Sequence, residues 1–277
     1  MALTVNTNVA SLNAQRNLTN SQSSLATAMQ RLSSGLRVNS AKDDAAGLAI
    51  AERMNAQVRG LTVGIRNAGD GISLAQTAEG ALGSVTESLQ RMRELAVQSS
   101  NATNSASDRV SLQAEYQQLS DEINRVIAGT QFNGSFILAT NAGAQDFQVG
   151  PNNTANDRIS VTTTDMSADA DITAVTAADI STDAASAQAA ITLVDTALDT
   201  VNSERATLGA AQSRMETAVR SLDNTRENTA AARGRIVDAD FAAETANLTR
   251  AQILQQAGVA MLSQANALPQ TALALLQ

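Results

Sequence analysis

The sequence predicts a mainly α-helical protein, an elongated antiparallel coiled coil or helical bundle with a small β-hairpin tip. Apolar residues make up 43% of the 277 residues, but only 2% are aromatic, so a thick globular core would lack its usual large side chains. Only Pro151 and Pro269 interrupt a chain whose apolar content is largely Ala, the best helix former. Long stretches carry apolar residues at steps of three and four, the spacing of a coiled coil.

Three long segments carry this spacing and predict long helices. The first lies within residues 45–98, with apolar residues at Val58, Leu61, Ile65, Ala68, Ile72, Ala75, Ala78, Leu82, Val85, Leu89 and Met92. The second places Leu112, Tyr116, Leu119, Ile123 and Val126 on one stripe, and the third places Ala187, Val194, Val201, Leu208, Met215 and Leu222 seven residues apart. We expect these helices to pack against one another along their stripes.

Six glycines lie inside the first segment, at positions 60, 64, 69, 71, 80 and 83. Each should cost a helix up to about 1 kcal/mol relative to Ala, so something must compensate. One interpretation is a loop that interrupts the segment around residues 69–71. We prefer a close approach of neighbouring helices, which small residues allow, because the apolar spacing continues through all six positions.

The two ends of the chain form a separate pair of short, uncharged helices. Arg16 is the only charged residue in positions 1–30, and none follows Arg250. A neutral outer face predicts a surface that a partner covers. The predicted assembly seam consists of Leu18, Leu25, Leu32, Leu254, Met261, Leu268 and Leu275. Such helices are marginal alone, so we expect them to be disordered in the monomer and to fold on assembly.

Breaks between the helices define two domains. Gly35 is placed to end the first helix, and Ser40 with Asp43 forms a capping box for the next. Gly234 ends the third long helix, and Asp238 or Asp240 caps the tail helix. The chain then folds back so that its ends pack side by side. We expect paired terminal helices at 1–44 and 235–277, and a rod-like helical domain at 45–234 with a β-hairpin region at about 130–165.

The outer tip is expected between about 130 and 185. "DFQVG" and "RISVTTT" alternate like strands and flank the turn-rich "PNNTAND", which predicts the hairpin. The acidic stretch that follows is interpreted as a surface loop. It lacks the Gly and terminal Glu spacing of an EF-hand, so calcium is not expected.

Composition excludes several classes of function. The absence of Cys and His excludes thiol and imidazole catalysis and Cys/His zinc sites. The 27 acidic residues are not grouped around a pocket, so we predict no enzyme and no cofactor or metal. A net charge of −8 argues against nucleic acid. No run of 18 apolar residues and no Sec-type signal occur, which predicts no membrane insertion.

Four segments resemble the signature regions of bacterial flagellin: "RLSSGLRVNSAKDDAAGLAIAERM", "LQRMRELAVQSSN", "TQFNGSFIL" and "RGRIVDADFAAETANLTRAQILQQAGVAMLSQAN". The resemblance covers about 1–150 and 185–277, so the chain is similar to a minimal flagellin with the two inner domains only. It implies a structural subunit that polymerises with itself into the flagellar filament for motility. It also implies an extracellular protein, exported by the flagellar type III route without a cleaved Sec signal.

The resemblance further implies partners. These are a flagellar export chaperone, hook-junction and cap proteins, and the Toll-like flagellin receptor of animal hosts. Arg91, Leu95 and Glu115 match the receptor-binding and inter-subunit positions, and the heptad register places Arg91 and Leu95 together on an outward face. The resemblance also implies that the chaperone or a cytosolic immune sensor recognises the tail residues Leu273, Leu275 and Leu276.

Three alternatives remain at this point. A hook–filament junction protein shares terminal heptads, although the "SAKDDAAGLAIA" and "TQFNGSFIL" matches favour the filament subunit. A peptidase-bearing flagellin would need an HExxH motif, which a chain without His does not have. Another secreted coiled-coil protein, such as an adhesin, would be expected to carry an anchor.

Overall fold

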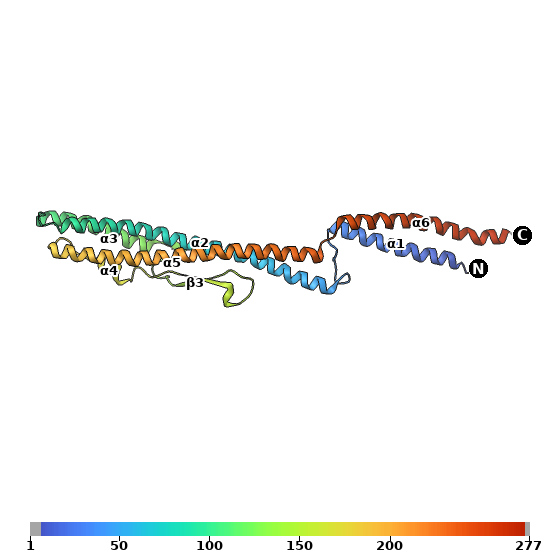
Figure 1. Cartoon of the computed structure of the whole chain (residues 1–277), viewed down its shortest axis with the longest axis horizontal. Coiled ribbons are helices and arrows are strands. Elements are labelled where there is room, and N and C mark those ends of the chain that lie inside the picture. Colours follow the sequence, from blue (N-terminus) through green and yellow to red (C-terminus); the bar gives the residue numbers. More distant parts are fainter. Residues whose placement is uncertain (1–6, 275–277) are drawn as a thin grey trace. The chain divides into compact units, whose positions relative to one another are not determined.

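The structure is a computed structural model that describes the backbone of residues 7–274 and the side chains of residues 7–267. Within this range the helices are α1 (Val9–Ser34), α2 (Ala45–Ser99), α3 (Ala106–Gly129), α4 (Ala170–Thr176), α5 (Ala184–Val237) and α6 (Phe241–Ala274), as Figure 1 shows. Two antiparallel strand pairs accompany them: β1 (Gln131–Phe132) with β2 (Ser135–Phe136), and β3 (Ala144–Gln148) with β4 (Arg158–Thr162). The predicted mainly α-helical bundle with a small β-hairpin is confirmed.

The chain divides into two compact units. Unit 1 comprises residues 1–56 and 228–277, and unit 2 comprises residues 57–227. Both boundaries therefore fall inside the long helices α2 and α5. The division proposed from the sequence, at 44/45 and 234/235, follows the helix ends predicted from the sequence instead, and it stays a proposal.

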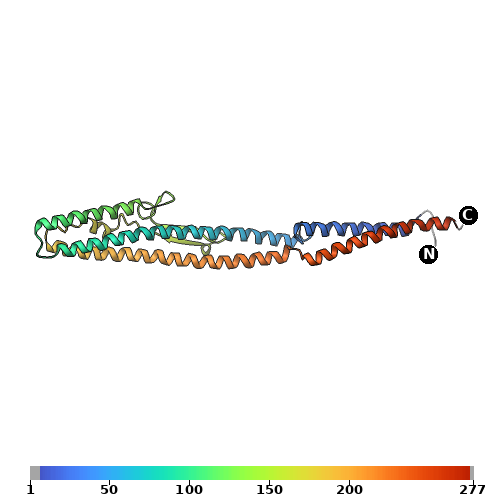
Figure 2. The same cartoon turned by 90° about the horizontal axis from the view of Figure 1, so that it is seen from above.

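In unit 1 the helices α1 and α6 run antiparallel and side by side (Figures 1 and 2). At one end of the pair, the Asn8 amide donates to the carbonyl oxygen of Ala265 at 2.8 Å. At the other end the two connecting segments pair with each other, because the Arg37 N–H donates to the carbonyl oxygen of Val237 at 2.7 Å. Val38, Ala51 and Val237 form a small buried cluster beneath this pairing.

The helix ends in unit 1 match the sequence-based predictions in part. Gly35 ends α1 as predicted, in the left-handed conformation with φ 71° that favours glycine. Asp240 caps α6 by accepting from the backbone N–H groups of Ala242 and Ala243. The other two predictions were wrong. Asp43 accepts from Ser40 in a turn before the helix, whereas Asp44 caps α2, and α5 continues through Gly234 to Val237.

Unit 2 has its core along α2, which contacts both α3 and α5 (Figure 2). The heptad stripes meet there, as predicted: Leu82, Leu89 and Met92 of α2 are fully buried with Leu208 and Met215 of α5. Tyr116 and Ile123 of α3 join the same cluster. The few large side chains are thus concentrated in a thin core between helices, where each contacts several neighbours.

The hairpin that packs on α2 explains two of the six glycines, Gly60 and Gly64. α2 is unbroken from Ala45 to Ser99, so a loop at residues 69–71 is excluded. A Cβ atom on Gly60 would lie 2.7 Å from Pro151 Cβ, and one on Gly64 would overlap the Val149 carbonyl group. Only Gly71 meets a neighbouring helix as predicted, at Met215 of α5. Gly69, Gly80 and Gly83 would have open space around a Cβ atom.

The hairpin formed by β3 and β4 has the predicted strands and turn, with Phe147 opposite Ile159. Its place differs from the predicted tip, since it lies beside the glycine positions of α2. The Asn67 amide of α2 donates to the carbonyl oxygen of Gln148 at 2.7 Å. Hydrophobic burial explains the difference, because Ile159 and Val161 on one face of β4 join the helical core. The smaller pair β1 and β2 was not predicted, although its turn, Asn133–Gly134, is a strong hairpin signal with φ 48° and 79°.

Tyr116 links α3 to α4 inside unit 2 and is the single tyrosine of the chain. Its hydroxyl group donates to the carbonyl oxygen of Val175 at 3.0 Å. Burial disfavours the charged tyrosinate and raises the pKa of Tyr116 to about 12. The side chain should therefore make stability depend on alkaline pH.

We expect the free energy of unfolding to fall as the pH rises from about 10 toward about 12, because the unfolded chain loses the Tyr116 proton first. The stabilisation from the protonated Tyr116 is fully present below the pKa of tyrosine in the unfolded chain and is lost as the pH passes the folded pKa, a change on the order of 3 kcal/mol. Tyr116→Phe should cost about 1 kcal/mol at neutral pH and remove this fall. Urea unfolding across the pH range, with tyrosinate absorbance, measures both. The same alkaline fall in Tyr116→Phe would refute the assignment.

Candidate assembly surface

The contact between α1 and α6 pairs leucines on one helix with small residues on the other. Leu18, Leu25 and Leu32 of α1 are partly buried there. The facing stripe of α6 is a strict seven-residue repeat of Glu244, Ala251, Gly258 and Ala265. A Cβ atom on Gly258 would lie 3.3 Å from Leu18 Cδ1, so the small side chains let the two helices approach closely.

The predicted seam is therefore divided between two surfaces. Leu18, Leu25 and Leu32 lie inside the α1–α6 contact, whereas Leu254 and Met261 are 51% and 63% exposed. The remaining predicted tail residues lie outside the described side chains: Leu268, Leu273, Leu275 and Leu276. The exposed leucine and methionine leave part of the predicted seam available to another molecule.

Apolar side chains are exposed around the circumference of α6. Leu254 and Met261 lie on one side of the helix, Ile253 on its back and Val259 on the opposite side. Each of these four is at least half exposed: Ile253 60%, Leu254 51%, Val259 51% and Met261 63%. On α1, Val9, Leu12 and Met29 are exposed in the same way. A helix that is apolar on every side is normally buried on every side.

A groove of about 1020 Å³ runs between α1 and α6 and is called here the α1–α6 groove. Two stripes flank it, each with steps of three and four residues: Ala10, Asn13, Asn17, Asn20, Ser24, Thr27 and Arg31 of α1, and Asn247, Arg250, Leu254, Ala257 and Met261 of α6. A third helix packs between two others by contacting such stripes. The lining residues of the groove thus have the spacing of a helix-binding site.

Three of the four hydroxyl groups that line the groove, those of Ser21, Ser24 and Thr27, already have hydrogen-bond partners within α1. Ser21 donates to the carbonyl oxygen of Asn17 at 2.9 Å, Ser24 to that of Asn20 at 3.0 Å, and Thr27 to that of Ser23 at 3.0 Å. Covering a hydroxyl group costs free energy only when it loses its partner. A partner helix can therefore exclude water from these positions without leaving a donor unpaired.

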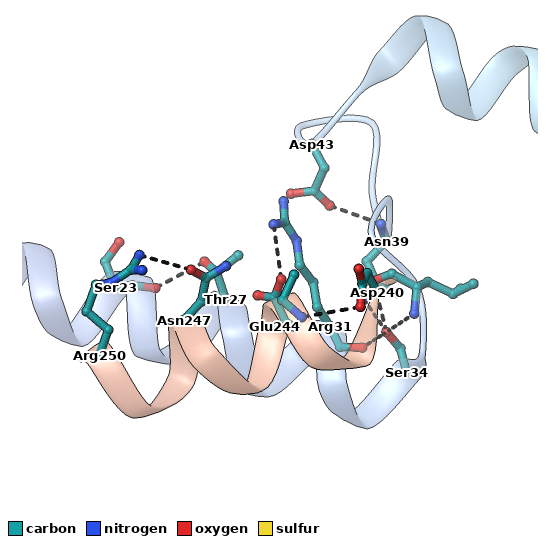
Figure 3. Close-up of polar contacts among 12 residues, drawn as sticks. Ser23, Thr27, Arg31, Ser34, Asn39, Asp43, Asp240, Glu244, Asn247 and Arg250 are labelled. Carbon is teal, nitrogen blue, oxygen red and sulfur yellow. Dashed lines mark hydrogen bonds and ion pairs between the residues drawn. The ribbon is translucent and has the colours of Figure 1, made fainter. Parts of the chain in front are cut away.

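The charges of the α1–α6 groove gather at one end (Figure 3). Arg31 points toward Glu244, with Nη1 and Oε2 at 4.0 Å, and Arg250 lines the groove nearby. Arg31 Nε is buried and has no hydrogen-bond partner among the described residues.

Asp43, in the turn before α2, accepts from the backbone and side chain of Ser40. These bonds, with Arg31 as a weaker contributor, lower the pKa of Asp43.

The positions matched to a receptor-binding site lie on α2 and α3. Arg91 Nη2 lies 2.7 Å from Glu115 Oε1, and Arg91 Nη1 lies 2.7 Å from Glu94 Oε2. The hydrogen bonds that Arg91 donates to the carboxylates of Glu94 and Glu115 raise the pKa of Arg91. These ion pairs are exposed, so they contribute little to stability. They form a charged surface across two helices.

Leu95 was placed wrongly by the sequence analysis, because it is only 1% exposed and belongs to the core of unit 2. The heptad register considered one partner of α2, and Leu89, Met92 and Ala96 are buried as that register requires. The packing of α3 on a second side of α2 buries Leu95 as well. Arg91 and Glu115 thus share the surface, and Leu95 lies beneath it.

Within the described residues, no group of three or more acidic side chains is arranged as candidate metal ligands. The aspartates of the acidic stretch instead accept hydrogen bonds from neighbouring residues. Asp179 accepts from Ser181 and Asp183 from Ser186, and these bonds lower both carboxyl pKa values. Over the same described range, no helix has the length and hydropathy needed to cross a bilayer.

Two family models match the chain. The model for the bacterial flagellin N-terminal helical region matches residues 5–142, and the model for the C-terminal helical region matches residues 191–276. The chain belongs to the bacterial flagellin family. Only residues 143–190 lie between the two matches, so the chain has the minimal form without a central variable domain.

Full-length relatives support the same membership. A flagellin of Halalkalibacterium halodurans is 49% identical over 273 residues, which cover 99% of each chain. A flagellin of Xenorhabdus nematophila is 46% identical over 315 residues, which cover both chains fully. Flagellins are structural proteins, so the chain is a structural subunit of the flagellar filament. As such it associates with itself and is exported to the outside of the cell.

Two solved structures are similar to parts of the chain. A flagellin of Bacillus cereus is 34% identical, with a TM-score of 0.49, and covers 57% of this chain and 88% of its own. A putative flagellar hook-associated protein from Vibrio parahaemolyticus is 15% identical, with a TM-score of 0.61, and covers 71% of this chain and 100% of its own. The second likeness concerns the fold alone.

Proposed function

We propose that the chain polymerises into the filament through the uncharged faces of α1 and α6, and that a helix of a neighbouring copy fills the α1–α6 groove. One observation carries the proposal: apolar residues are exposed around α6, at Ile253, Leu254, Val259 and Met261. In a single subunit these side chains would contact water. Covering them with further copies supplies the hydrophobic free energy that drives association.

The two sides of this contact differ, which favours a filament over a closed dimer. The groove lies on one side of the α1–α6 pair, whereas Ile253 and Val259 face away from it. A contact between two different surfaces is head-to-tail, and it generates a helical polymer when the rotation does not close. Folding of the terminal helices would then be coupled to assembly, as proposed for the inner domain.

Electron microscopy of purified protein after salting out or seeding tests the proposal. We expect filaments from the full chain and none from a chain that lacks residues 260–277, because that deletion removes Met261 and the end of α6. Filaments from the shortened chain would contradict the proposed contact. Absence of filaments from the full chain would contradict polymerisation itself.

The remaining roles follow from family resemblance and are proposed on that basis. The subunit is exported by the flagellar type III route and contacts an export chaperone, hook-junction proteins and cap proteins. A chaperone or cytosolic sensor recognises Leu273, Leu275 and Leu276. The rival assignment to a hook–filament junction protein is disfavoured by full-length identity to flagellins of 49% and 46%.

We also propose that animal Toll-like receptors detect the subunit through the surface that carries Arg91 and Glu115. Arg91→Ala should reduce signalling in a receptor reporter assay by at least about tenfold, because it removes a charged hydrogen-bonding group from an exposed contact. Arg91 is largely exposed, so the fold should be retained. Leu95→Ala is unsuitable, because emptying a core site costs about 2–5 kcal/mol and confuses binding with unfolding. Unchanged signalling by Arg91→Ala would refute this role.

A further inference from the structure

Five of the seven methionines of this chain occupy two contrasting environments, whereas Met54 on α2 is partly buried and Met1 lies outside the described residues. Met92, Met166 and Met215 are buried in the core of unit 2, with exposed fractions of 0%, 1% and 0%. Met29 and Met261 are 51% and 63% exposed, and both lie on the terminal helices of unit 1. The sequence has no cysteine, so no thiol competes with these thioethers for oxidants.

The two exposed methionines lie on surfaces that the proposed polymer covers. Met261 belongs to the α6 stripe of the α1–α6 groove, with Leu254 and Ala257. Met29 lies on α1, next to the buried Ala28 but outside the groove. Neither side chain packs in the core of the subunit, so a chemical change at either sulfur should leave the fold of unit 1 intact.

We propose that Met29 and Met261 are sites of reversible oxidation by two-electron oxidants such as hydrogen peroxide, and that their oxidation prevents a subunit from joining the polymer. The effect on assembly rests on the proposed function. In the reaction, the thioether sulfur takes one oxygen atom from peroxide. The S–O bond forms as the O–O bond breaks, the sulfur loses two electrons, and the peroxide is reduced to water.

The consequence for assembly follows from polarity. A sulfoxide is a strong hydrogen-bond acceptor, and in the exposed state water satisfies it. Covered by a neighbouring helix in the groove at Met261, or by another copy on the uncharged face of α1 at Met29, the same oxygen would lose its water partners. Oxidation before assembly thus opposes assembly, whereas assembly before oxidation shields both sulfur atoms. Methionine sulfoxide reductases reverse the change.

Peptide mass spectrometry of the dissolved subunit after timed peroxide treatment tests the sites. We expect Met29 and Met261 to oxidise at least about tenfold faster than Met92, Met166 and Met215, which react only when unit 2 opens. Comparable rates at all five positions would overturn the assignment. In preformed filaments the rates at Met29 and Met261 should fall by about tenfold or more. Unchanged rates in filaments would show that these residues are not covered.

A polymerisation assay tests the effect, with Met29→Leu, Met261→Leu as the matched variant because Leu keeps the apolar character and approximate volume. Peroxide treatment should lower the filament yield of the natural chain by about tenfold and leave the double variant unaffected. Reductase treatment should restore the natural chain. An equal loss in the variant, or no loss in the natural chain, would overturn the inference. Failure of the untreated natural chain to polymerise would instead refute the proposed function, and the oxidation ranking in the subunit would stand independently.

Discussion

A chain that carries Leu254→Glu and Met261→Glu is expected to fold normally as a subunit and to form no filaments. In the subunit the two side chains are 51% and 63% exposed, so the new carboxylates remain hydrated, and the free energy of unfolding of the subunit should change by less than about 0.5 kcal/mol. In the polymer a neighbouring helix would remove water from both. An unpaired buried charge costs several kcal/mol, so each carboxylate would oppose the contact.

Circular dichroism, thermal unfolding and electron microscopy together check this expectation. The matched control is Leu254→Met with Met261→Leu, which keeps both positions apolar and should polymerise like the natural chain. Filaments of normal yield from the glutamate variant would refute the proposed contact. Loss of helical content in that variant would mean instead that these positions support the fold of the subunit.

Gly64→Ala is expected to lower the free energy of unfolding by at least about 2 kcal/mol, although Ala is the better helix former. The added Cβ atom would overlap the Val149 carbonyl group, which is backbone and has no rotamer by which to move away. The hairpin must therefore shift off α2, with loss of the hydrogen bond from Asn67 to Gln148. Hydrogen exchange should accelerate in β3 and β4 before it does in the helices.

Gly80→Ala in the same helix is the control, because nothing lies within 4 Å of a Cβ atom at that position. It should raise the free energy of unfolding by up to about 1 kcal/mol through helix propensity alone. Urea unfolding of the two variants gives the comparison. A stabilised Gly64→Ala variant would show that the hairpin does not pack on α2 as described.

The sequence predicted the helices because their apolar spacing is long and regular. The stripe from Leu82 to Met92 is fully buried, as its period requires. The apolar period of α2 predicts the face that packs on one neighbouring helix, but it does not predict that another helix packs on a second face. Leu95 was therefore assigned to the surface. Only the packing of α3 on α2 decides that position. Strands β3 and β4 were predicted from local alternation, yet their docking site on α2 depends on contacts distant in sequence.

The terminal seam shows a different limit. Two seven-residue stripes run along α6, one through Leu254 and Met261 and the other through Ala251 and Gly258. Hydrophobicity favours the first as the contact with α1, but the leucines of α1 fill the interface and leave room only for small residues. The outer stripe is then left for other copies. Size complementarity between helices, rather than apolar content, decides the pairing.

The near absence of charge on α1 and α6 has a consequence for ionic strength. Most of the acidic residues behind the net charge of −8 lie in unit 2, whereas the helical pair of unit 1 carries Arg16, Arg31, Glu244 and Arg250 as its charged side chains. Neighbouring subunits therefore repel through unit 2 and attract through unit 1. Dissolved ions screen the repulsion and leave the apolar attraction intact. The salt content of the medium would thus set the threshold concentration at which dissolved subunits and filament coexist.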